Sequence, residues 1–172
     1  MVPEREARCQ SCRALAALAI LVTGEMSWTR FLAYGLFGWC AEVVWTAGYA
    51  LVRGTRRGHP VPREERWRLQ GHTYLWMLPI YGSAALLFEP AHDHLRAHFW
   101  ALRGAVYMLG CFAVEALSGL ALKSTVGKCP WDYSYSRFSA IGGTIRLDYA
   151  PVWFSFGLLL ERLHDFLLRV LP

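Results

Sequence analysis

Residues 31–52 read FLAYGLFGWCAEVVWTAGYALV, an apolar run whose single charged side chain is Glu42. At a rise of about 1.5 Å per residue, a helix of this length reaches about 33 Å, which is enough to cross a hydrocarbon core of about 30 Å. We therefore predict a membrane-spanning helix over residues 31–52. This prediction decides the fold class and guides the interpretation of the apolar runs that follow.

Three further apolar runs predict the remaining spans. Residues 73–89 form the shortest run and contain Pro79 and Gly82, so this run either crosses with the help of flanking groups or does not cross fully. The other two runs are long enough to cross unaided. The sequence thus predicts an all-α integral membrane bundle of four transmembrane helices, with spans at about residues 31–52, 73–89, 99–122 and 150–171.

Residues 1–30 are predicted to form a leader before the four-span helical membrane domain of residues 31–172. Residues 14–22 are apolar, but they are far fewer than the roughly 20 that a span requires. Behind three arginines they resemble the hydrophobic region of a signal peptide, yet no A-x-A cleavage site follows them. We expect an uncleaved interfacial helix that leads into the first span, and a cleaved signal peptide is the alternative.

The composition also indicates a bilayer environment. Hydrophobic residues make up 55% of the chain and charged residues 18%, whereas soluble domains contain about 45–50% apolar and about 25% charged residues. This balance argues against a disordered, collagen-like, coiled-coil or disulfide-stapled secreted chain. The net charge of +5 is typical of basic residues that flank spans, and no nucleic-acid-binding motif accompanies it, so we expect no nucleic-acid partner.

Three of the predicted spans each carry a carboxylate near mid-membrane: Glu42, Glu115 and Glu161. A charge at this depth costs about 2.5–3.5 kcal/mol, so it normally faces the bundle interior. Each glutamate shares a helical stripe with small residues, as Glu42 does with Gly35 and Gly38. We predict that the three faces meet around an intramembrane acidic site for a cation, a proton or a small cationic substrate.

An alternative is a purely structural role for these carboxylates. Glu42 or Glu115 would then pair with Arg162 or Arg103 and lock the helices together. If instead the carboxylates meet in a low dielectric, protons, a metal, Arg162 or a bound substrate must compensate their charge.

Sharper chemical motifs are incomplete in this sequence. His92, His94 and His98 have ligand-like spacing, and we interpret them as solvated residues of a short polar connection. Gly127-Lys128 lacks the remaining residues of a phosphate-binding loop, so we expect no nucleotide hydrolysis by this chain. The sequence therefore identifies no catalytic residue, no metal and no cofactor.

Four strings occur in order along the chain: FxxYGLFGWCAEVVWTAGY, GHTYLWMLPIYGSAALLFE, VEALSGLAL and CPWDYSYSRFSAIGGTIRLDYAPVWF. On these strings the chain resembles the transmembrane protein 229 family of animals and the bacterial CmpB-like permeases, labelled ABC-transporter type IV, over about residues 31–161. The resemblance implies a small multi-pass helical membrane protein with a permease-like role. The family-typical positions in this sequence are Glu42, Gly71, His72, Pro79, Tyr81, Gly82, Glu89, Glu115, Cys129, Trp131, Asp132, Tyr133 and Ser134.

The string around Asp132 suggests how a loop supports the site. Asp132 can accept backbone N–H groups two residues on, while Trp131 and Tyr133 pin the turn at the headgroup level. Such a turn would cover the acidic centre from one side, and Asp132 is either a turn-former or a ligand. His72, Tyr81 and Glu89 complete the predicted set of supporting loop or interface residues.

The leading hypothesis is a permease-like transport component that works with the lipid bilayer and with a second copy or a separate ATPase subunit. One alternative is an intramembrane enzyme that acts on lipid, in which Glu42 or Glu115 is the general acid or base and His72 or Asp132 assists. Another is a non-catalytic scaffold or assembly factor. The sequence favours a protein that is not an enzyme, and it does not identify the membrane.

Overall fold

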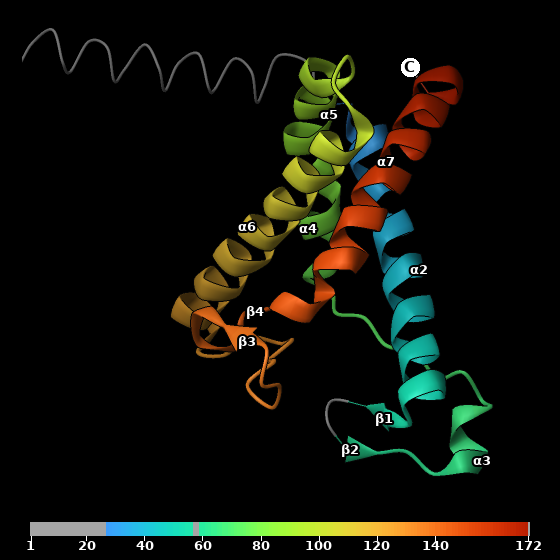
Figure 1. Cartoon of the computed structure of the whole chain (residues 1–172), viewed down its shortest axis with the longest axis vertical. Helices are drawn as coiled ribbons and strands as arrows, with labels where there is room; N and C mark the ends of the chain where they lie inside the picture. Colours follow the sequence, from blue (N-terminus) through green and yellow to red (C-terminus); the bar gives the residue numbers. More distant parts are fainter. Residues whose placement is uncertain (1–26, 57–58, 172) are drawn as a thin grey trace, which may run out of the picture.

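The computed structural model describes residues 27–56 and 59–171, and this part of the chain is mostly helical, as predicted. The leader's predicted interfacial helix lies outside the described residues. In chain order the helices are α2 (Trp28–Arg53), α3 (Arg63–Arg66), α4 (Met77–Gly82), α5 (Ala84–Leu95), α6 (Trp100–Val126) and α7 (Ala150–Val170) (Figure 1).

Helices α2 and α6 agree with the first and third predicted spans. Helix α2 begins after Ser27, whose side-chain oxygen accepts a hydrogen bond from the backbone N–H of Arg30 at 3.4 Å. It ends at Gly54, which takes a left-handed conformation with φ of 67°. Within the described ranges, α2 and α6 are the helices long and apolar enough to cross a membrane.

The second and fourth predicted spans have a more complex structure. The run 73–89 is divided into α4 and α5 on either side of Ser83, and α5 continues to Leu95, beyond the predicted boundary. Helix α7 follows its predicted range closely, but its second half carries Glu161, Arg162 and Asp165. The membrane nature of the fold is supported by α2 and α6, and the four-span topology stays a prediction.

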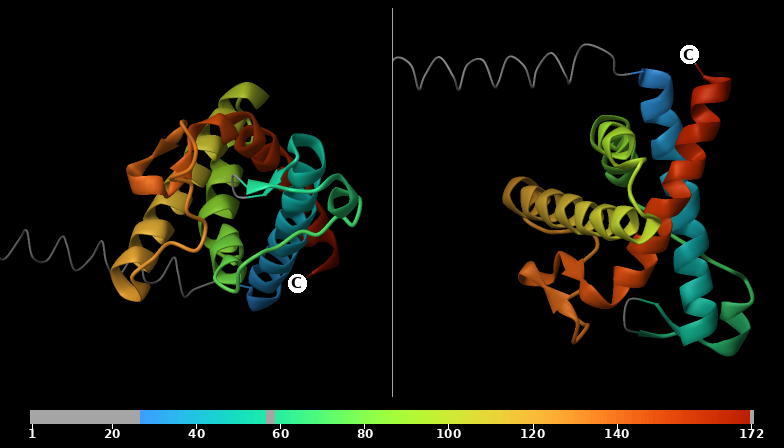
Figure 2. Two further views of the ribbon diagram at one scale, coloured as in Figure 1. Left: turned by 90° about the horizontal axis from the view of Figure 1, so that it is seen from below. Right: turned by 45° about the horizontal axis from the view of Figure 1, so that its top comes forward.

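The helices pack in two principal pairs. Helix α2 lies along α4, and α6 lies along α7, while α5 contacts both α2 and α6. In the view from below, α4 and α5 lie between α2 and α6 (Figure 2). A core cluster of buried residues joins α2, α5, α6 and α7: Tyr34, Phe88, Tyr107, Leu160 and Leu167.

Short loops with little regular structure close one end of the bundle. A hairpin of β1 (Thr55–Arg56) and β2 (His59–Pro60) follows α2, and a second hairpin of β3 (Ser139–Ala140) and β4 (Ile145–Arg146) precedes α7. Both hairpins lie at the lower end in Figure 1, opposite the carboxyl end of α7. This placement brings the loop of residues 127–149 beside the lower ends of α6 and α7.

The close approach of α2 and α4 depends on Gly38. A Cβ atom built at Gly38 would lie 2.1 Å from Cγ of Tyr81, whereas a Cβ at Gly48 would meet nothing within 4 Å. We expect Gly38→Ala to destabilise the protein by about 1–3 kcal/mol, because the Tyr81 ring must move out of its packed position. Thermal unfolding in detergent measures this loss. Gly48→Ala is the matched control and should be neutral or slightly stabilising; an equal loss in both variants would contradict the packing described here.

Candidate functional site

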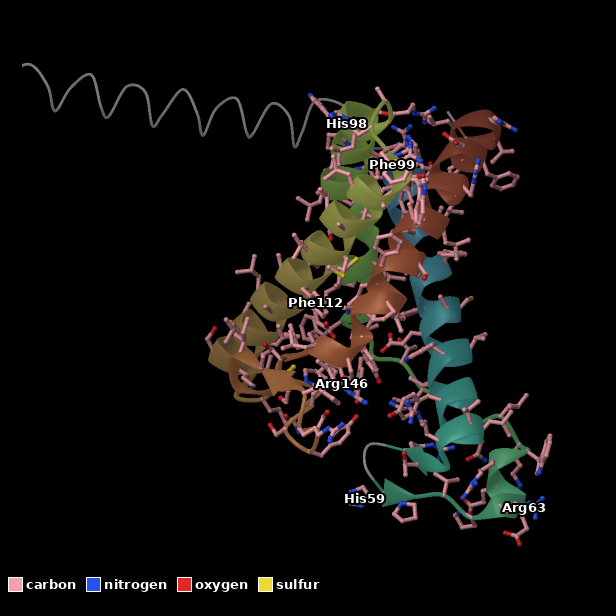
Figure 3. All side chains as sticks on the ribbon, viewed as in Figure 1. His59, Arg63, His98, Phe99, Phe112 and Arg146 are labelled. Carbon is pink, nitrogen blue, oxygen red and sulfur yellow. The ribbon has the colours of Figure 1, made fainter. Side chains whose placement is uncertain are left out.

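A cavity of about 680 Å³ lies among the helices. Its walls come from α2, α4, α5, α6 and α7 together with the loop that follows α6. Most of the lining is apolar or aromatic, and Figure 3 shows many side chains between these helices above Arg146. A cavity of this size and character suits a small organic molecule rather than a bare ion.

Two of the three predicted carboxylates line this cavity from different helices. Glu42 lies on α2 and Glu115 on α6. The Thr73 hydroxyl donates a hydrogen bond to Oε2 of Glu42 at 2.6 Å, and the Tyr133 hydroxyl donates to Oε1 of Glu115 at 2.9 Å. These donors fix the orientation of both carboxylates while leaving part of each acidic group available to the cavity.

The second carboxylate oxygen of Glu115, Oε2, accepts no hydrogen bond from the described residues. Glu115 is 8% exposed, and its Oε2 is buried without a hydrogen-bond partner among the described residues. The indole Nε1 of Trp153 on α7 is the donor that approaches Glu115, and its geometry falls short of a full hydrogen bond. A buried acceptor that lacks a donor is costly, so this oxygen is a natural contact for a ligand that brings positive charge or a proton.

Aromatic rings surround the carboxylates. On the α2 side, the Trp45 and Tyr49 rings both contact Tyr149, with ring centroids 5.8 and 6.4 Å apart. Tyr81 of α4 lies close enough to both Glu42 and Glu115 to interact with them electrostatically. Aromatic faces attract cations when the charge lies within about 6 Å of the ring, so the walls and the carboxylates favour the same sign of charge.

The loop after α6 supplies a fixed cover to this part of the cavity. Asp132 Oδ1 accepts hydrogen bonds from the backbone N–H of Ser134 at 2.9 Å and from its hydroxyl at 2.5 Å. These bonds hold the pKa of Asp132 below its ordinary value. The Trp131 indole donates to the carbonyl of Thr144 at 3.1 Å. The turn that the sequence suggests at Asp132 is therefore built, and its carboxylate is occupied by that turn.

Tyr133 connects the loop to the acidic site. Burial, together with the negative charge of Glu115, raises the pKa of Tyr133 well above its ordinary value. The phenol therefore remains protonated and continues to donate its hydrogen bond to Glu115 at physiological pH. His72, Tyr81, Trp131 and Asp132 also line the cavity.

A family comparison adds an independent line of evidence. Residues 29–171 match the model of the family described as "Putative ABC-transporter type IV". The chain belongs to this family. No solved structure matches the chain significantly. The link to the transmembrane protein 229 family stays a prediction.

Membership of the ABC-transporter type IV family agrees with a membrane component of a transport system. It also agrees with α2 and α6, which have the length and composition of spans. The family match alone assigns no role to any residue, so the roles of Glu42 and Glu115 depend on the geometry of the cavity.

Glu161 does not join the other two carboxylates. Its Oε1 lies 3.0 Å from Nε of Arg103 and 3.5 Å from Nδ1 of His92, and Glu161 is not among the residues that line the cavity. The structure therefore corrects the expected meeting of three glutamates to a meeting of two. Arg162, which the sequence offers as a compensating charge, is exposed.

The antiparallel register of α6 and α7 explains this pairing. Gly157 packs against Tyr107, where a Cβ atom would lie 2.4 Å from the Cβ of tyrosine. Glu161 lies four residues after Gly157, and Arg103 lies four residues before Tyr107. Both therefore lie nearer the upper end of the bundle, where they meet. The sequence contains both residues, but it does not show which turn of α6 faces which turn of α7.

Glu89 and the histidines also differ from expectation. Glu89 lies outside the cavity lining and pairs with Arg30, with Nε and Oε1 3.5 Å apart. His92 is 2% exposed on α5, so its interpretation as a solvated loop residue was wrong. The same interpretation holds better for His94 and His98, which are exposed.

Sequence reasoning missed Arg146 as a site residue. Its guanidinium binds both carboxylate oxygens of Asp148, at 2.8 and 2.7 Å, and donates to the Tyr49 hydroxyl at 3.1 Å. It also lies 4.5 Å from the centroid of the Tyr149 ring. Figure 3 shows Arg146 beside the lower ends of α6 and α7. In the sequence, Asp148 follows Arg146 by two residues, a spacing that suits a local ion pair and could have pointed to this role. In the structure, Arg146 contacts two tyrosines that line the cavity, Tyr49 and Tyr149.

The described residues contain no group of three or more His, Cys, Asp or Glu side chains arranged to hold a metal ion. Besides Glu42 and Glu115, the charged side chains among the residues that line the cavity are those of Asp132 and Arg56.

Proposed function

We propose that this chain is the membrane component of a transport system and that it binds an organic cation in the cavity between Glu42 and Glu115. The observation that carries the proposal is that two carboxylates from separate helices line one aromatic cavity. Each is oriented by a hydroxyl donor, and Glu115 retains a buried oxygen without a hydrogen bond.

The chemistry of the walls defines the substrate class. Two carboxylates held in a low dielectric favour a ligand of positive charge, because that charge offsets their mutual repulsion. The largely apolar lining favours a ligand whose charge is surrounded by hydrocarbon. A lipophilic quaternary cation meets both requirements, whereas a small hydrated ion would leave most of the cavity unfilled.

The family suggests the proposed assembly. We propose that α7 and the α4–α5 segment also lie within the membrane and complete a four-span domain over residues 31–172. Since the sequence contains no phosphate-binding loop, energy from nucleotide hydrolysis would come from a separate ATPase subunit. A second copy of the chain is the alternative partner.

A pair of probes of the same shape and opposite charge tests the proposal. Tetraphenylphosphonium and tetraphenylborate carry the same four phenyl groups around a cationic or an anionic centre. We expect the purified protein in lipid nanodiscs to bind tetraphenylphosphonium at least about tenfold more tightly than tetraphenylborate, after subtraction of binding to empty nanodiscs. Equal affinity for the two probes, or tighter binding of the anion, would reject the proposed cation site.

A further inference from the structure

A second polar cluster lies at the opposite end of the bundle from the two hairpins, near His98 and Phe99 (Figure 3). It lies where α5 ends, α6 begins and α7 approaches its carboxyl end. Its members come from α2, α5, α6 and α7: Arg30, Tyr34, Glu89, His92, Arg103, Tyr107, Glu161 and His164. The first four belong to residues 28–98, the first half of the described chain, and the last four to residues 100–170, the second half.

A pattern of residues in α2 recurs in α6. Four residues have an identical residue 73 positions later: Arg30 and Arg103, Tyr34 and Tyr107, Glu42 and Glu115, and Gly54 and Gly127. Gly54 and Gly127 both end their helices in a left-handed conformation, with φ of 67° and 84°. The first long helix of each half therefore carries the same arginine, tyrosine, glutamate and capping glycine in the same register.

A second pattern recurs in the segments that return to the upper end, α4–α5 and α7. Five residues have an identical residue 72 positions later: Pro79 and Pro151, Ser83 and Ser155, Glu89 and Glu161, His92 and His164, and Asp93 and Asp165. Patterns that recur in the same order at nearly the same spacing indicate an internal repeat. Helices α2 and α6 both begin at the upper end, where α5 and α7 both end (Figure 1), so the two halves run in the same direction.

The buried ion pairs of the cluster lie within each half. In the first half, Nε of Arg30 lies 3.5 Å from Oε1 of Glu89. In the second half, Nε of Arg103 lies 3.0 Å from Oε1 of Glu161. A buried carboxylate requires a compensating charge close by. Each half supplies its own, so neither half depends on the other to neutralise its glutamate.

A close helix contact is also repeated within each half, with the two partners exchanged. In the first half, a Cβ atom built at Gly82 would lie 2.8 Å from the ring of Phe31. At the equivalent positions of the second half, a Cβ atom built at Gly104 would lie 2.5 Å from the ring of Phe154. One aromatic ring thus fills the same space in both halves, from opposite helices. Each half therefore packs as a unit.

The contacts between the halves are reciprocal. The Tyr34 hydroxyl lies 3.0 Å from Nδ1 of His164, and the Tyr107 hydroxyl lies 3.0 Å from Nδ1 of His92. Each histidine also lies 3.5 Å from Oε1 of the glutamate in the opposite half. The two imidazole rings meet each other, with centroids 5.2 Å apart. Such an exchange of identical contacts is typical of two units related by a two-fold axis.

An ion pair at the rim adds a weaker contact between the halves. Nη2 of Arg96 lies 2.5 Å from Oδ1 of Asp165, and the two side chains are 51% and 32% exposed. An exposed pair of this kind contributes little to stability. Separation of the halves would therefore break hydrogen bonds and a screened ion pair, whereas the buried arginine–glutamate pairs, which are far more costly to break, would stay intact.

The cavity lies between the same two halves. Glu42 lines it from the first half, and Glu115 lines it from the equivalent position of the second. Its walls reach Tyr34 and Tyr107 of the second polar cluster at the upper end, and β1 at the lower end. Both tyrosines are buried, at 1% and 5% exposed. The second polar cluster therefore closes the cavity at the end opposite the hairpins.

We propose that the two halves are structural repeats that move as units, and that the second polar cluster is the gate between them. When the Tyr34–His164 and His92–Tyr107 hydrogen bonds break, the halves separate at the upper end and expose the cavity to that side. Transporters built from repeats place their site between the repeats and open by movement of one against the other. This role as a gate rests on the proposed function, because it controls the access of the cation to Glu42 and Glu115.

Distances between spin labels at the upper end test the gate. In a chain whose native cysteines are replaced by alanine, labels on His94→Cys of α5 and Arg169→Cys of α7 report the distance between the halves. Labels on His94→Cys and Thr29→Cys of α2 report a distance within the first half. All three positions are exposed. Double electron–electron resonance of the protein in nanodiscs, without any ligand, gives both distance distributions.

Tyr34→Phe combined with Tyr107→Phe removes the two hydroxyls that join the halves. We expect the ratio of a longer to a shorter population of the distance between the halves to rise about tenfold or more. The reason is that two buried ring nitrogens lose their partners in the closed state, whereas water can reach them in the open state. The distance within the first half should keep its wild-type distribution. The two single variants should produce smaller shifts of similar size, because Tyr34 and Tyr107 are equivalent.

Ser124→Ala combined with Ser155→Ala is the control, because it removes two hydroxyls that bond only to carbonyls of their own helices. It should leave both distances unchanged. An unchanged distance between the halves in the folded tyrosine variants, or an equal change in both distances, would overturn the gate. If the double variant does not elute as a single species, the single variants decide by the same criteria. The expected separation without tetraphenylphosphonium binding would reject the proposed function alone.

Discussion

Replacement of both Glu42 and Glu115 by glutamine is expected to weaken tetraphenylphosphonium binding by about 100-fold or more. An interaction with a charged group contributes roughly 1.5–3 kcal/mol, and each 1.4 kcal/mol corresponds to about tenfold in affinity. Glutamine keeps the side-chain shape and an oxygen that can accept from Thr73 or Tyr133. The loss would therefore arise from the missing charges, and it is measured by titration of the protein in nanodiscs.

The control for this variant removes the same number of charges outside the cavity. Glu64 and Glu65 lie on the short helix α3, and both are exposed. Glu64→Gln combined with Glu65→Gln should leave the affinity within about twofold, because exposed charges are screened beyond roughly 10 Å. Wild-type affinity in the Glu42→Gln, Glu115→Gln chain would show that the cavity carboxylates do not bind the cation.

Arg103→Met is expected to cause the largest loss of stability, about 3 kcal/mol. The substitution leaves Glu161 without its close cationic partner, and a buried charge without compensation is strongly destabilising. Methionine retains much of the apolar stem of arginine, so the loss of packing is small. Thermal or denaturant unfolding of the detergent-solubilised protein measures the change in the free energy of unfolding.

A double variant separates the ion pair from simple packing. Arg103→Met combined with Glu161→Met removes both charges, and we expect it to recover most of the stability that Arg103→Met loses. The recovery follows because no buried charge is then left unpaired. If the two substitutions instead destabilise additively, the pairing of Arg103 with Glu161 does not stabilise α6 against α7.

The sequence predicts the long helices and the principal carboxylates because both signals are local. A long apolar run requires a helix in lipid, and one charge within it must turn away from the hydrocarbon. Glu42 and Glu115 each satisfy this condition, and both line the cavity. The turn at Asp132 is equally local, because its hydrogen bonds reach only two residues along the chain.

The second cluster could not be predicted in the same way because it depends on register and on helix boundaries. His92 lies beyond the predicted end of the second span, yet α5 continues past it and buries its ring. Glu161, like Glu115, lies within a long apolar run of the sequence. The register of α6 against α7 nevertheless places Glu161 beside Arg103. The aromatic neighbours of Arg146 include Tyr49, which is far away in sequence, so local spacing does not reveal this contact.

A crystal structure of the chain with tetraphenylarsonium tests the central claim most directly, because arsenic gives an anomalous signal that marks the cation. We predict an anomalous peak inside the cavity, between the carboxylates of Glu42 and Glu115 and within about 6 Å of an aromatic ring. A peak found only on the outer surface of the bundle, or carboxylates that point away from a shared cavity, would contradict the account.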